Sequence, residues 1–496
     1  MKSQQKLFSG KWFFLFPLLI AIYPIIFLYS NNVQELLISQ LYVLVVVALI
    51  VTSICWISLT FLIKDALKAG LITAIFILFF FAYGSIIDWL VLLNFFTVKH
   101  RHILPIVLFV AGYLGFFIYL IRNPEFFVNS AKILTVIISV LLLLNIINII
   151  PYELKKIEYA NQKSVLTEKY SFDNFTDSTE SYPDIYYIVL DEYASSSTIK
   201  EIWGYDNYEF ENYLRNQGFY IADKSRTHMA DTLYSTASNL NMIYINESDT
   251  LTLFSKINDN QVMQYLKNIG YTTVVFDGIK VFYPKKGNIT ADIEFIFDEQ
   301  KEGNGLPENT FNNLVIEHTM LKSLSSNVEY YRNLIRNRNQ ITFEFEKLQS
   351  SVNTVSSPKF VYFHITSPHA PFVFEKDGDY VDPQNQQNWQ DKKYYLGQYI
   401  YTNRQIEYSI DNILSNSKTP PIIIIQSDHG PRIQYRPAPD EKTEMPPDEK
   451  FKIFYAYYMP DNSEKILLFN NISSANTFRI IFNQTFHDDI ELLEGV

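Results

Sequence analysis

Long apolar runs separated by short polar segments occupy the first third of the chain. Five of them approach or exceed the ~20 residues that a helix needs to cross a bilayer. Five such runs in succession are not typical of buried core helices. The runs are Trp12–Tyr29, Leu37–Ile63, Leu71–Phe96, Ile103–Ile121 and Ile133–Ile150. This pattern predicts a five-helix transmembrane domain over residues 1–151.

Loop charges predict the orientation of these helices. Lys2, Lys6 and Lys11 precede the first run, whereas the next loop carries Glu35 and no Lys or Arg. The positive-inside rule therefore favours a cytoplasmic N-terminus, although the basic cluster at 99–102 opposes it. An odd number of spans then predicts a multi-pass cell-membrane protein whose remaining part is extracytoplasmic.

The pattern changes at Pro151, which we expect to end the last span. Residues 152–182 are polar and charged and predict a juxtamembrane linker that is helical at its start. From residue 183 to 496, short apolar runs alternate with amphipathic segments. The expected strands are Asp184–Leu190, Phe219–Ile221, Tyr271–Phe276, Ile293–Phe297, Phe360–Phe363 and Ile422–Ile425. The expected helices include Tyr208–Asn216, Thr232–Ile243, Val262–Ile269, Phe311–Leu324, Val328–Gln349 and Gln398–Ser415. This alternation predicts an α/β domain with a mainly parallel sheet flanked by helices.

Composition narrows the chemistry of the outer domain. The one cysteine, Cys55, lies in the second apolar run, so the domain from 183 onward has no disulfide and no thiolate ligand. The formal net charge of −11 argues against a nucleic-acid partner.

Polar groups follow three of the predicted strands. Asp191 comes directly after the first, His364 after Phe360–Phe363, and Asp428-His429 follows Ile422–Ile425 by way of Gln426 and Ser427. Because ligands bind at the carboxyl ends of strands in open α/β sheets, these groups are expected to converge. Carboxylates with an imidazole suit a divalent cation. The alternative for Asp191 and Glu192 is a helix start, with Asp191 as N-cap.

His364 and His369 lie five residues apart where a strand passes into a loop. Such a pair can line one pocket, either as donors to a phosphate or as ligands of a second cation. A surface or core histidine is the simpler alternative for each residue alone.

Thr232 is the candidate nucleophile. It lies where a helix is expected to begin, so free backbone N–H groups would favour a phosphate or an alkoxide there. A cation nearby would lower the pKa of its hydroxyl. Ser235 and Ser238 have equivalent chemistry, and a capping role for Thr232 or Asp231 is the structural alternative.

Taken together, these motifs resemble the alkaline phosphatase superfamily in its sulfatase-like branch. The resemblance is to the membrane-anchored lipoteichoic acid synthases and lipid A phosphoethanolamine transferases, which also join five spans to an outer catalytic domain. The motifs that carry it are the acid at Asp191, Thr-x-x-Ser from Thr232 to Ser235, the stretch from His364 to Pro371, and Ser-Asp-His-Gly from Ser427 to Gly430.

The resemblance implies a metal-dependent membrane-bound transferase. The implied ligands of one zinc or manganese ion are Asp191, Thr232, Asp428 and His429. Thr232 would take a phosphoglycerol or phosphoethanolamine head group from a phospholipid as a phosphothreonine and pass it to a glycan or lipid acceptor. His364 and His369 would bind the substrate.

Other functions remain as alternatives. A phosphodiesterase or phosphatase would use the same site with water as acceptor. A catalytically silent membrane sensor or binding module would lack an intact ligand set. A transporter would need polar groups in its spans, for which Asp88 is the main candidate. A sulfatase proper is disfavoured, because no Cys or Ser begins a Cys/Ser-x-Pro-x-Arg motif.

Overall fold

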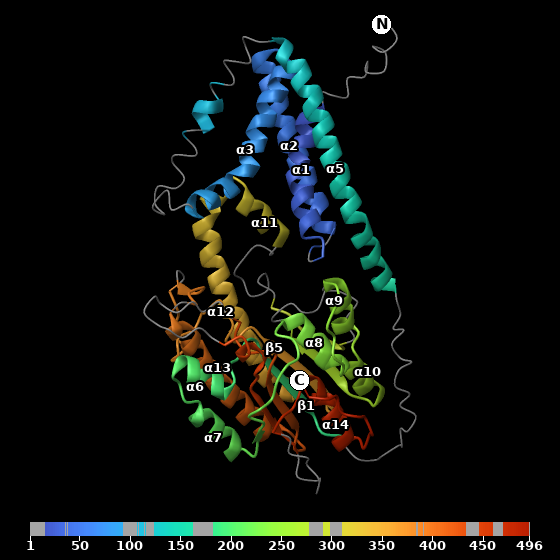
Figure 1. Ribbon diagram of the computed structural model, residues 1–496, viewed down its shortest axis with the longest axis vertical. Helices are drawn as coiled ribbons and strands as arrows, with labels where there is room; N and C mark the ends of the chain where they lie inside the picture. Colours follow the sequence, from blue (N-terminus) through green and yellow to red (C-terminus); the bar gives the residue numbers. More distant parts are fainter. Residues whose placement is uncertain are drawn as a thin grey trace. The chain divides into compact units, whose positions relative to one another are not determined.

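The computed structural model describes residues 15–34, 36, 38–92, 107, 109–113, 115, 124–161, 182–276, 291–297, 310–382, 385–389, 391–432, 446–459 and 470–495. The chain forms two compact units (Figure 1). The first comprises Met1–Asn161 with Leu306–Tyr330, and the second comprises Gln162–Gly305 with Tyr331–Val496. The segment from 306 to 330 thus groups with the first unit, which the sequence pattern did not indicate.

The first unit is helical. Its N-terminal helices are α1 (Phe16–Asn31), α2 (Ile38–Ile63), α3 (Ala66–Leu92) and α5 (Pro124–Asn161). Among the described residues, three stretches are long and apolar enough to cross a membrane, namely Ile38–Ile63, Ala66–Trp89 and Ala131–Ile157. α1 is a shorter apolar helix. The fourth predicted span, Ile103–Ile121, lies mostly outside the described residues, so the structure supports an apolar helical region rather than the count of five.

Helix α5 continues through Pro151 to Asn161. A proline inside a helix removes one backbone hydrogen bond and disturbs the preceding turn. In a helix of 38 residues the other hydrogen bonds maintain the element on both sides. The start of the predicted linker at 152–182 is therefore helical.

Helix α11 (Thr310–His318) packs on the other helices of the first unit. The ring of Phe311 lies 5.7 Å from that of Tyr29, measured between centroids. A Cβ on Gly84 would lie 2.0 Å from the backbone oxygen of Glu317, so this approach requires glycine. Lys322 Nζ lies 2.7 Å from Asp88 Oδ1. The acid that a transporter would use is therefore neutralised by a lysine of the same unit.

The second unit is built on a seven-stranded sheet in the order β2-β7-β6-β1-β5-β3-β4. The strands are β1 (Ile185–Leu190), β2 (Tyr220–Ile221), β3 (Thr272–Phe276), β4 (Ile293–Phe295), β5 (Lys359–Ile365), β6 (Ile422–Ser427) and β7 (Tyr455–Tyr458). β1 pairs in parallel with both β5 and β6, and β3 pairs in parallel with β4 and β5. β7 pairs antiparallel with β6 and β2. The sheet is therefore mixed, and mainly parallel around its centre.

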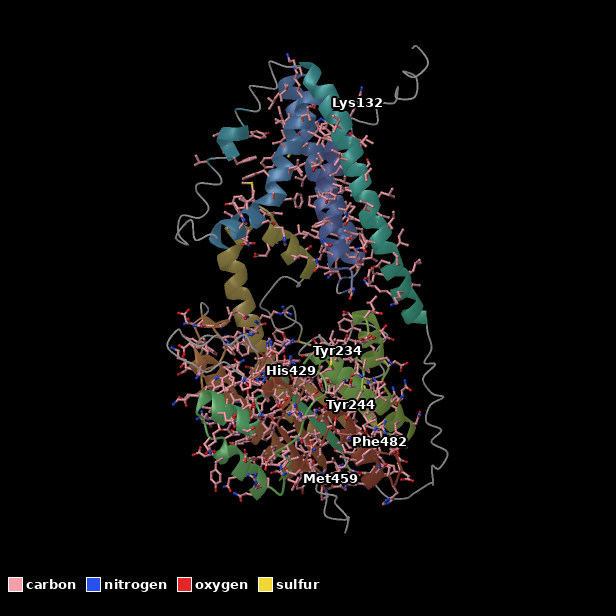
Figure 2. The ribbon with its side chains drawn as sticks, viewed as in Figure 1. Lys132, Tyr234, Tyr244, His429, Met459 and Phe482 are labelled. Atoms are coloured by element: carbon pink, nitrogen blue, oxygen red, sulfur yellow. The ribbon has the colours of Figure 1, made fainter. Side chains whose placement is uncertain are left out.

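Helices cover both faces of this sheet. Along β1, Tyr186, Ile188 and Leu190 belong to one buried cluster, whereas the residues between them belong to the other. The helices of the first face are α6 (Ser196–Trp203), α7 (Tyr208–Asn216), α13 (Lys392–Asn416) and the later part of α12 (Lys322–Thr354). Those of the second face are α8 (Thr232–Asn241), α9 (Thr250–Asn258), α10 (Gln261–Asn268) and α14 (Thr477–Thr485). Phe482, labelled in Figure 2, lies on α14. Its ring stacks on that of Tyr265 of α10. Because both faces are covered, the central strands hold their ends in fixed register.

Candidate active site

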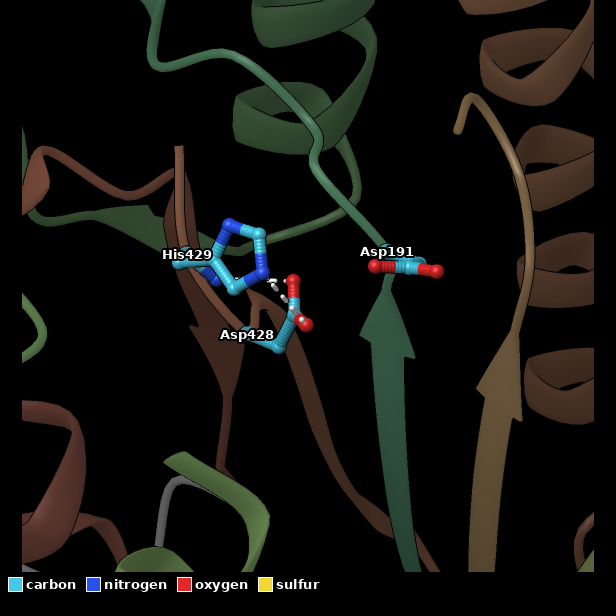
Figure 3. Close-up of side chains that lie close together, drawn as sticks. All are labelled: Asp191, Asp428 and His429. Carbon is cyan, nitrogen blue, oxygen red and sulfur yellow. Dashed lines mark hydrogen bonds and ion pairs between the residues drawn. The ribbon is translucent and has the colours of Figure 1, made fainter. Parts of the chain in front are cut away.

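The strand register brings the predicted acids together. Leu190 pairs with Ser427 across β1 and β6, so the residues that follow them, Asp191 and Asp428, lie side by side. Asp191, Asp428 and His429 each offer one ligand atom, and these atoms lie within 4.8 Å of one another (Figure 3). All three side chains are buried. Two separate motifs thus form one cluster at the carboxyl edge of the sheet.

Gly430, directly after His429, lies where the packing leaves no room for a side chain. A Cβ at this position would lie 2.3 Å from the backbone oxygen of Glu449 and 2.8 Å from that of Lys452. The Gly430 N–H donates to the carbonyl of Lys450 at 2.8 Å. The glycine of the Ser-Asp-His-Gly motif is therefore required by this close packing, which holds His429 at the cluster.

Thr232 reaches the cluster from the first turn of α8. The N-cap is Asp231, whose carboxylate accepts from the N–H groups of Leu233 and Tyr234. Thr232 therefore does not cap the helix, and its Oγ1 donates to Asp428 Oδ2 at 2.9 Å. The same hydroxyl lies 3.4 Å from His429 Nε2. The hydroxyl thus lies beside the grouped ligand atoms and at a helix N-terminus.

The two competing serines do not make these contacts. Ser235 is fully buried and donates to the backbone oxygen of Asp428 at 2.7 Å. Ser238, also buried, lies 3.4 Å from His228 Nε2. Of the three hydroxyls that the sequence left open, Thr232 is the one in contact with the side chains of the cluster.

The charge of Asp191 is compensated only in part, by the nearby Arg432 guanidinium. Burial raises the pKa of its carboxyl well above the usual value, and the charges of Asp428 and Glu192 raise it further. Its Oδ1 is buried without a hydrogen-bond partner. A buried carboxylate in this state repels its neighbours unless a cation is near.

Asp428 is stabilised in its charged form. Burial alone would raise the pKa of this carboxyl, but His429 and His364 oppose it, as do hydrogen bonds from the Glu192 N–H and the Thr232 hydroxyl. Their combined effect holds the pKa of Asp428 below its usual value. The surroundings of Asp428 therefore favour its carboxylate form, whereas those of Asp191 disfavour it.

The donor set fits a divalent cation. Asp191, Asp428 and His429 offer two carboxylates and an imidazole, and Thr232 adds a hydroxyl oxygen. This combination of oxygen and nitrogen suits zinc or manganese. His429 Nδ1 lies 2.7 Å from the Gly430 carbonyl, an outer contact of the kind that orients histidine ligands. The unpartnered Oδ1 of Asp191 is the atom that such an ion would satisfy.

The two other histidines lie in different surroundings. His364 is fully buried, its Nδ1 lies 2.8 Å from the Tyr362 hydroxyl, and its Nε2 has no hydrogen-bond partner. Burial lowers the pKa of His364 to about 4, so it is neutral at neutral pH. His369 is partly exposed, and its Nε2 lies 3.9 Å from Glu192 Oε1. Neither is in the group of ligand atoms formed by Asp191, Asp428 and His429.

Sequence reasoning missed the partner of Glu192. The alternative of a helix start at Asp191 is wrong, because α6 begins at Ser196 with Ser195 as its N-cap. The Glu192 carboxylate instead accepts from Arg432 Nε at 2.5 Å. The available signal was the position of Arg432, two residues beyond the glycine of the Ser-Asp-His-Gly motif.

A family comparison confirms the sulfatase-like resemblance that the motifs predicted. The chain belongs to the sulfatase family, whose profile matches residues 183–488. The second unit is thus that of an enzyme of this family. No curated protein matches the chain by sequence.

Several solved structures are similar to this chain. The zinc complex of the C-terminal periplasmic domain of EptC from Escherichia coli shares 10% identity and covers 63% of this chain and 84% of its own, with a TM-score of 0.43. The integral membrane protein lipooligosaccharide phosphoethanolamine transferase A from Neisseria meningitidis shares 12% sequence identity. The match covers 73% of this chain and 62% of that protein, with a TM-score of 0.37. The lipoteichoic acid synthase LtaP from Listeria monocytogenes shares 16% sequence identity. The match covers 57% of this chain and 66% of that protein, with a TM-score of 0.35.

Proposed function

We propose that this protein is a metal-dependent, membrane-bound transferase that moves a phospho head group from a phospholipid to a glycan or lipid acceptor. The observation that carries the proposal is the Thr232 hydroxyl, 2.9 Å from Asp428 Oδ2 at the N-terminus of α8. Membership of the sulfatase family supports an ester-cleaving site, and the apolar helices of the first unit support a lipid donor.

The residues that would hold the cation are Asp191, Thr232, Asp428 and His429. A bound divalent cation would supply positive charge that offsets the buried carboxylates and stabilises negative charge on the phosphoryl group. The positive end of the α8 helix dipole favours the same phosphoryl oxygens. His364, neutral and with a free Nε2, and His369 would donate hydrogen bonds to the substrate.

In the first step, Thr232 Oγ attacks the phosphorus of the donor. The bond from Oγ to phosphorus forms while the bond from phosphorus to the glycerol oxygen of the diacylglycerol breaks. The Thr232 hydroxyl proton passes first to Asp428 Oδ2, to which it already donates, and leaves as the hydroxyl hydrogen of the diacylglycerol. The product is a phosphothreonine that carries the head group.

In the second step, a hydroxyl of the glycan or lipid acceptor attacks the same phosphorus. The bond from phosphorus to Thr232 Oγ breaks, and the acceptor proton returns to Thr232 by way of Asp428 Oδ2. If water takes the place of the acceptor, the enzyme is a phosphodiesterase. The first step is common to both enzymes, so their products separate them.

A threonine nucleophile favours phosphate over sulfate esters. Formylglycine, which sulfatases proper use, is made from Cys or Ser, and the described cluster contains Thr232 at the position of the nucleophile. The intact cluster of Asp191, Asp428 and His429 also disfavours a catalytically silent binding module. Extracytoplasmic placement of the second unit, predicted from loop charges, would give it access to envelope acceptors.

The test uses the full-length protein in detergent, loaded with zinc or manganese and incubated with mixed bacterial phospholipids. Intact mass and peptide mapping should find a phospho head-group adduct on Thr232, and its mass identifies the donor. Thr250→Ala is the matched control, because Thr250 also follows an N-cap aspartate at the first position of a helix. An adduct that persists in Thr232→Ala would contradict the proposal, as would a metal-loaded wild type that forms none with any phospholipid.

A further inference from the structure

The backbone of Glu192 is locked into the cluster. Its φ is 53°, in the left-handed region, and its side chain is buried. Its N–H donates to Asp428 Oδ1 at 3.0 Å, and its carbonyl accepts from the Tyr395 hydroxyl at 2.7 Å. A non-glycine residue in this conformation is held there by its surroundings, so the direction of its carboxylate is fixed as well.

This carboxylate binds one end of a guanidinium. Arg432 donates from Nε to Glu192 Oε1 at 2.5 Å, while its side chain stays 40% exposed against 3% for Glu192. Among the described parts of the chain, no group accepts from the two terminal amino groups of Arg432. Arg432 is therefore anchored through its inner nitrogen, with its outer donors left for a ligand.

The charges of the site require this arginine. Asp191, Glu192 and Asp428 are buried together and carry more negative charge than one divalent cation neutralises. The guanidinium of Arg432 supplies the missing positive charge, and it acts on both neighbouring acids. Without it, an anionic substrate would approach a site that is net negative even with the cation bound.

We propose that Arg432 binds a non-bridging oxygen of the phosphodiester that Thr232 attacks, and that Glu192 is the positioning residue that holds the guanidinium at the cluster. A planar guanidinium with free outer donors matches the oxygens of a phosphate group. His369, whose Nε2 lies 3.9 Å from Glu192 Oε1, lies on the same side of the site. The inference rests on the proposed phosphotransfer and assigns its anion contact.

The test is calorimetric binding of inorganic phosphate to the zinc-loaded full-length protein, with zinc content measured for every variant. A charge-assisted hydrogen bond of this kind predicts that Arg432→Gln weakens phosphate binding about tenfold to hundredfold with zinc retained. Arg432→Lys keeps the positive charge but loses the planar, forked set of donors. Its phosphate affinity should therefore lie between those of wild type and Arg432→Gln. Arg404→Gln is the matched control, because Arg404 is similarly exposed and also paired with a carboxylate, that of Asp377.

A double-mutant cycle tests the role of Glu192. Glu192→Gln should weaken phosphate binding when Arg432 is present and have little further effect in the Arg432→Gln background. A merely structural ion pair would lower the melting temperature but leave the phosphate affinity of zinc-loaded molecules unchanged. That result would overturn the inference, and so would a zinc-loaded wild type that binds no phosphate.

This test is separate from that of the proposed function because it needs no turnover. Phosphate binding that depends on Arg432, in a protein that forms no Thr232 adduct, would support the anion contact and reject phosphotransfer. An adduct on Thr232, with phosphate binding that does not depend on Arg432, would support phosphotransfer and reject the anion contact.

Discussion

Asp184 and Asp191 flank the two ends of strand β1, and both side chains are buried. At the amino end, Asp184 accepts hydrogen bonds from the Ser357 hydroxyl and the Lys359 N–H, and Lys359 Nζ lies 3.5 Å away. At the carboxyl end, Asp191 has an oxygen without any partner and a second buried acid, Asp428, beside it. One strand thus carries a satisfied carboxylate and an unsatisfied one.

On the proposed function, the difference separates a structural carboxylate, Asp184, from a metal-binding one, Asp191. Lys359 also donates to the carbonyls of Ser351, Val352 and Val355, so it ties the end of α12 to the sheet. Such a cation stabilises the last carbonyls of a helix. Among the described residues Asp191 makes no ion pair, and Arg432, whose charge acts on it, is paired with Glu192, so we expect the balancing cation to be a bound metal ion.

The largest effect is expected at the carboxyl end, from Thr232→Ala. Loss of a nucleophile removes the intermediate, so turnover of a phosphodiester should fall by about 10⁴-fold or more. Thr250→Ala, at the equivalent position of α9, should leave turnover unchanged. Product formation over time by the metal-loaded full-length protein measures both. Comparable rates for wild type and Thr232→Ala would show that Thr232 is not the nucleophile.

At the amino end, Lys359→Met should be strongly destabilising. It leaves Asp184 buried without its counter-ion and frees three helix-end carbonyls, for a loss of about 3 kcal/mol in the free energy of unfolding. The melting temperature of the full-length protein in detergent should fall by several degrees. The double variant Asp184→Asn/Lys359→Met should recover part of the loss, and a single variant as stable as wild type would contradict the structural role.

In protein freed of metal by a chelator, Asp191→Asn should raise the free energy of unfolding, whereas Lys359→Met lowers it. The raised pKa of Asp191 means that ionisation opposes folding, so stability is lost as pH rises from the unfolded-state pKa of about 3.9 through the folded-state pKa. The neutral amide removes this loss, and the metal-free variant should be about 1–2 kcal/mol more stable than wild type at neutral pH. Melting curves across pH measure it. A metal-free Asp191→Asn protein that melts lower than wild type would mean that Asp191 is a structural acid like Asp184.

The smallest effect is expected at Asp292, a carboxylate that is paired with a lysine, as Asp184 is, but is more exposed. Burial alone would raise the pKa of Asp292, but hydrogen bonds with Lys267 and Thr273 lower it below its usual value. Its contribution is therefore present above the unfolded-state pKa and lost as pH falls through the folded-state pKa. Asp292→Asn should cost about 0.5 kcal/mol at neutral pH and nothing in strong acid. An equal difference in the free energy of unfolding between wild type and Asp292→Asn at both pH values would show that the charge of Asp292 plays no part.

Much of this arrangement could be predicted from sequence because strand ends are easy to locate. The first strand ends at Leu190 as expected, β6 ends at Ser427, two residues beyond the expected Ile425, and parallel pairing brings Asp191 next to Asp428. The choice between Thr232 and Ser235 was out of reach, because both lie in the same helical turn and only side-chain direction separates them. The contact between Glu192 and Arg432 spans 240 residues, and the only signal of it in the sequence is the place of Arg432 two residues after the glycine of the Ser-Asp-His-Gly motif.

The missed elements are short or carry conflicting local signals. β7 (Tyr455–Tyr458) is a four-residue strand, and α6 starts in a run of serines, which favour caps and turns over helix interiors. The grouping of α11 with the first unit depends on contacts such as Phe311 with Tyr29, which periodicity within one helix does not specify.

The most direct test of the account is a zinc titration of the metal-free full-length protein, followed by calorimetry and melting temperature. Wild type and Asp184→Asn should each bind one equivalent, and zinc at a thousand times the Kd should add about 4 kcal/mol of stability. Asp191→Asn should lose most of this binding and stabilisation. A wild type that binds no zinc or manganese, or an Asp191→Asn variant that binds as tightly as wild type, would contradict the claim that the two ends of β1 differ in function.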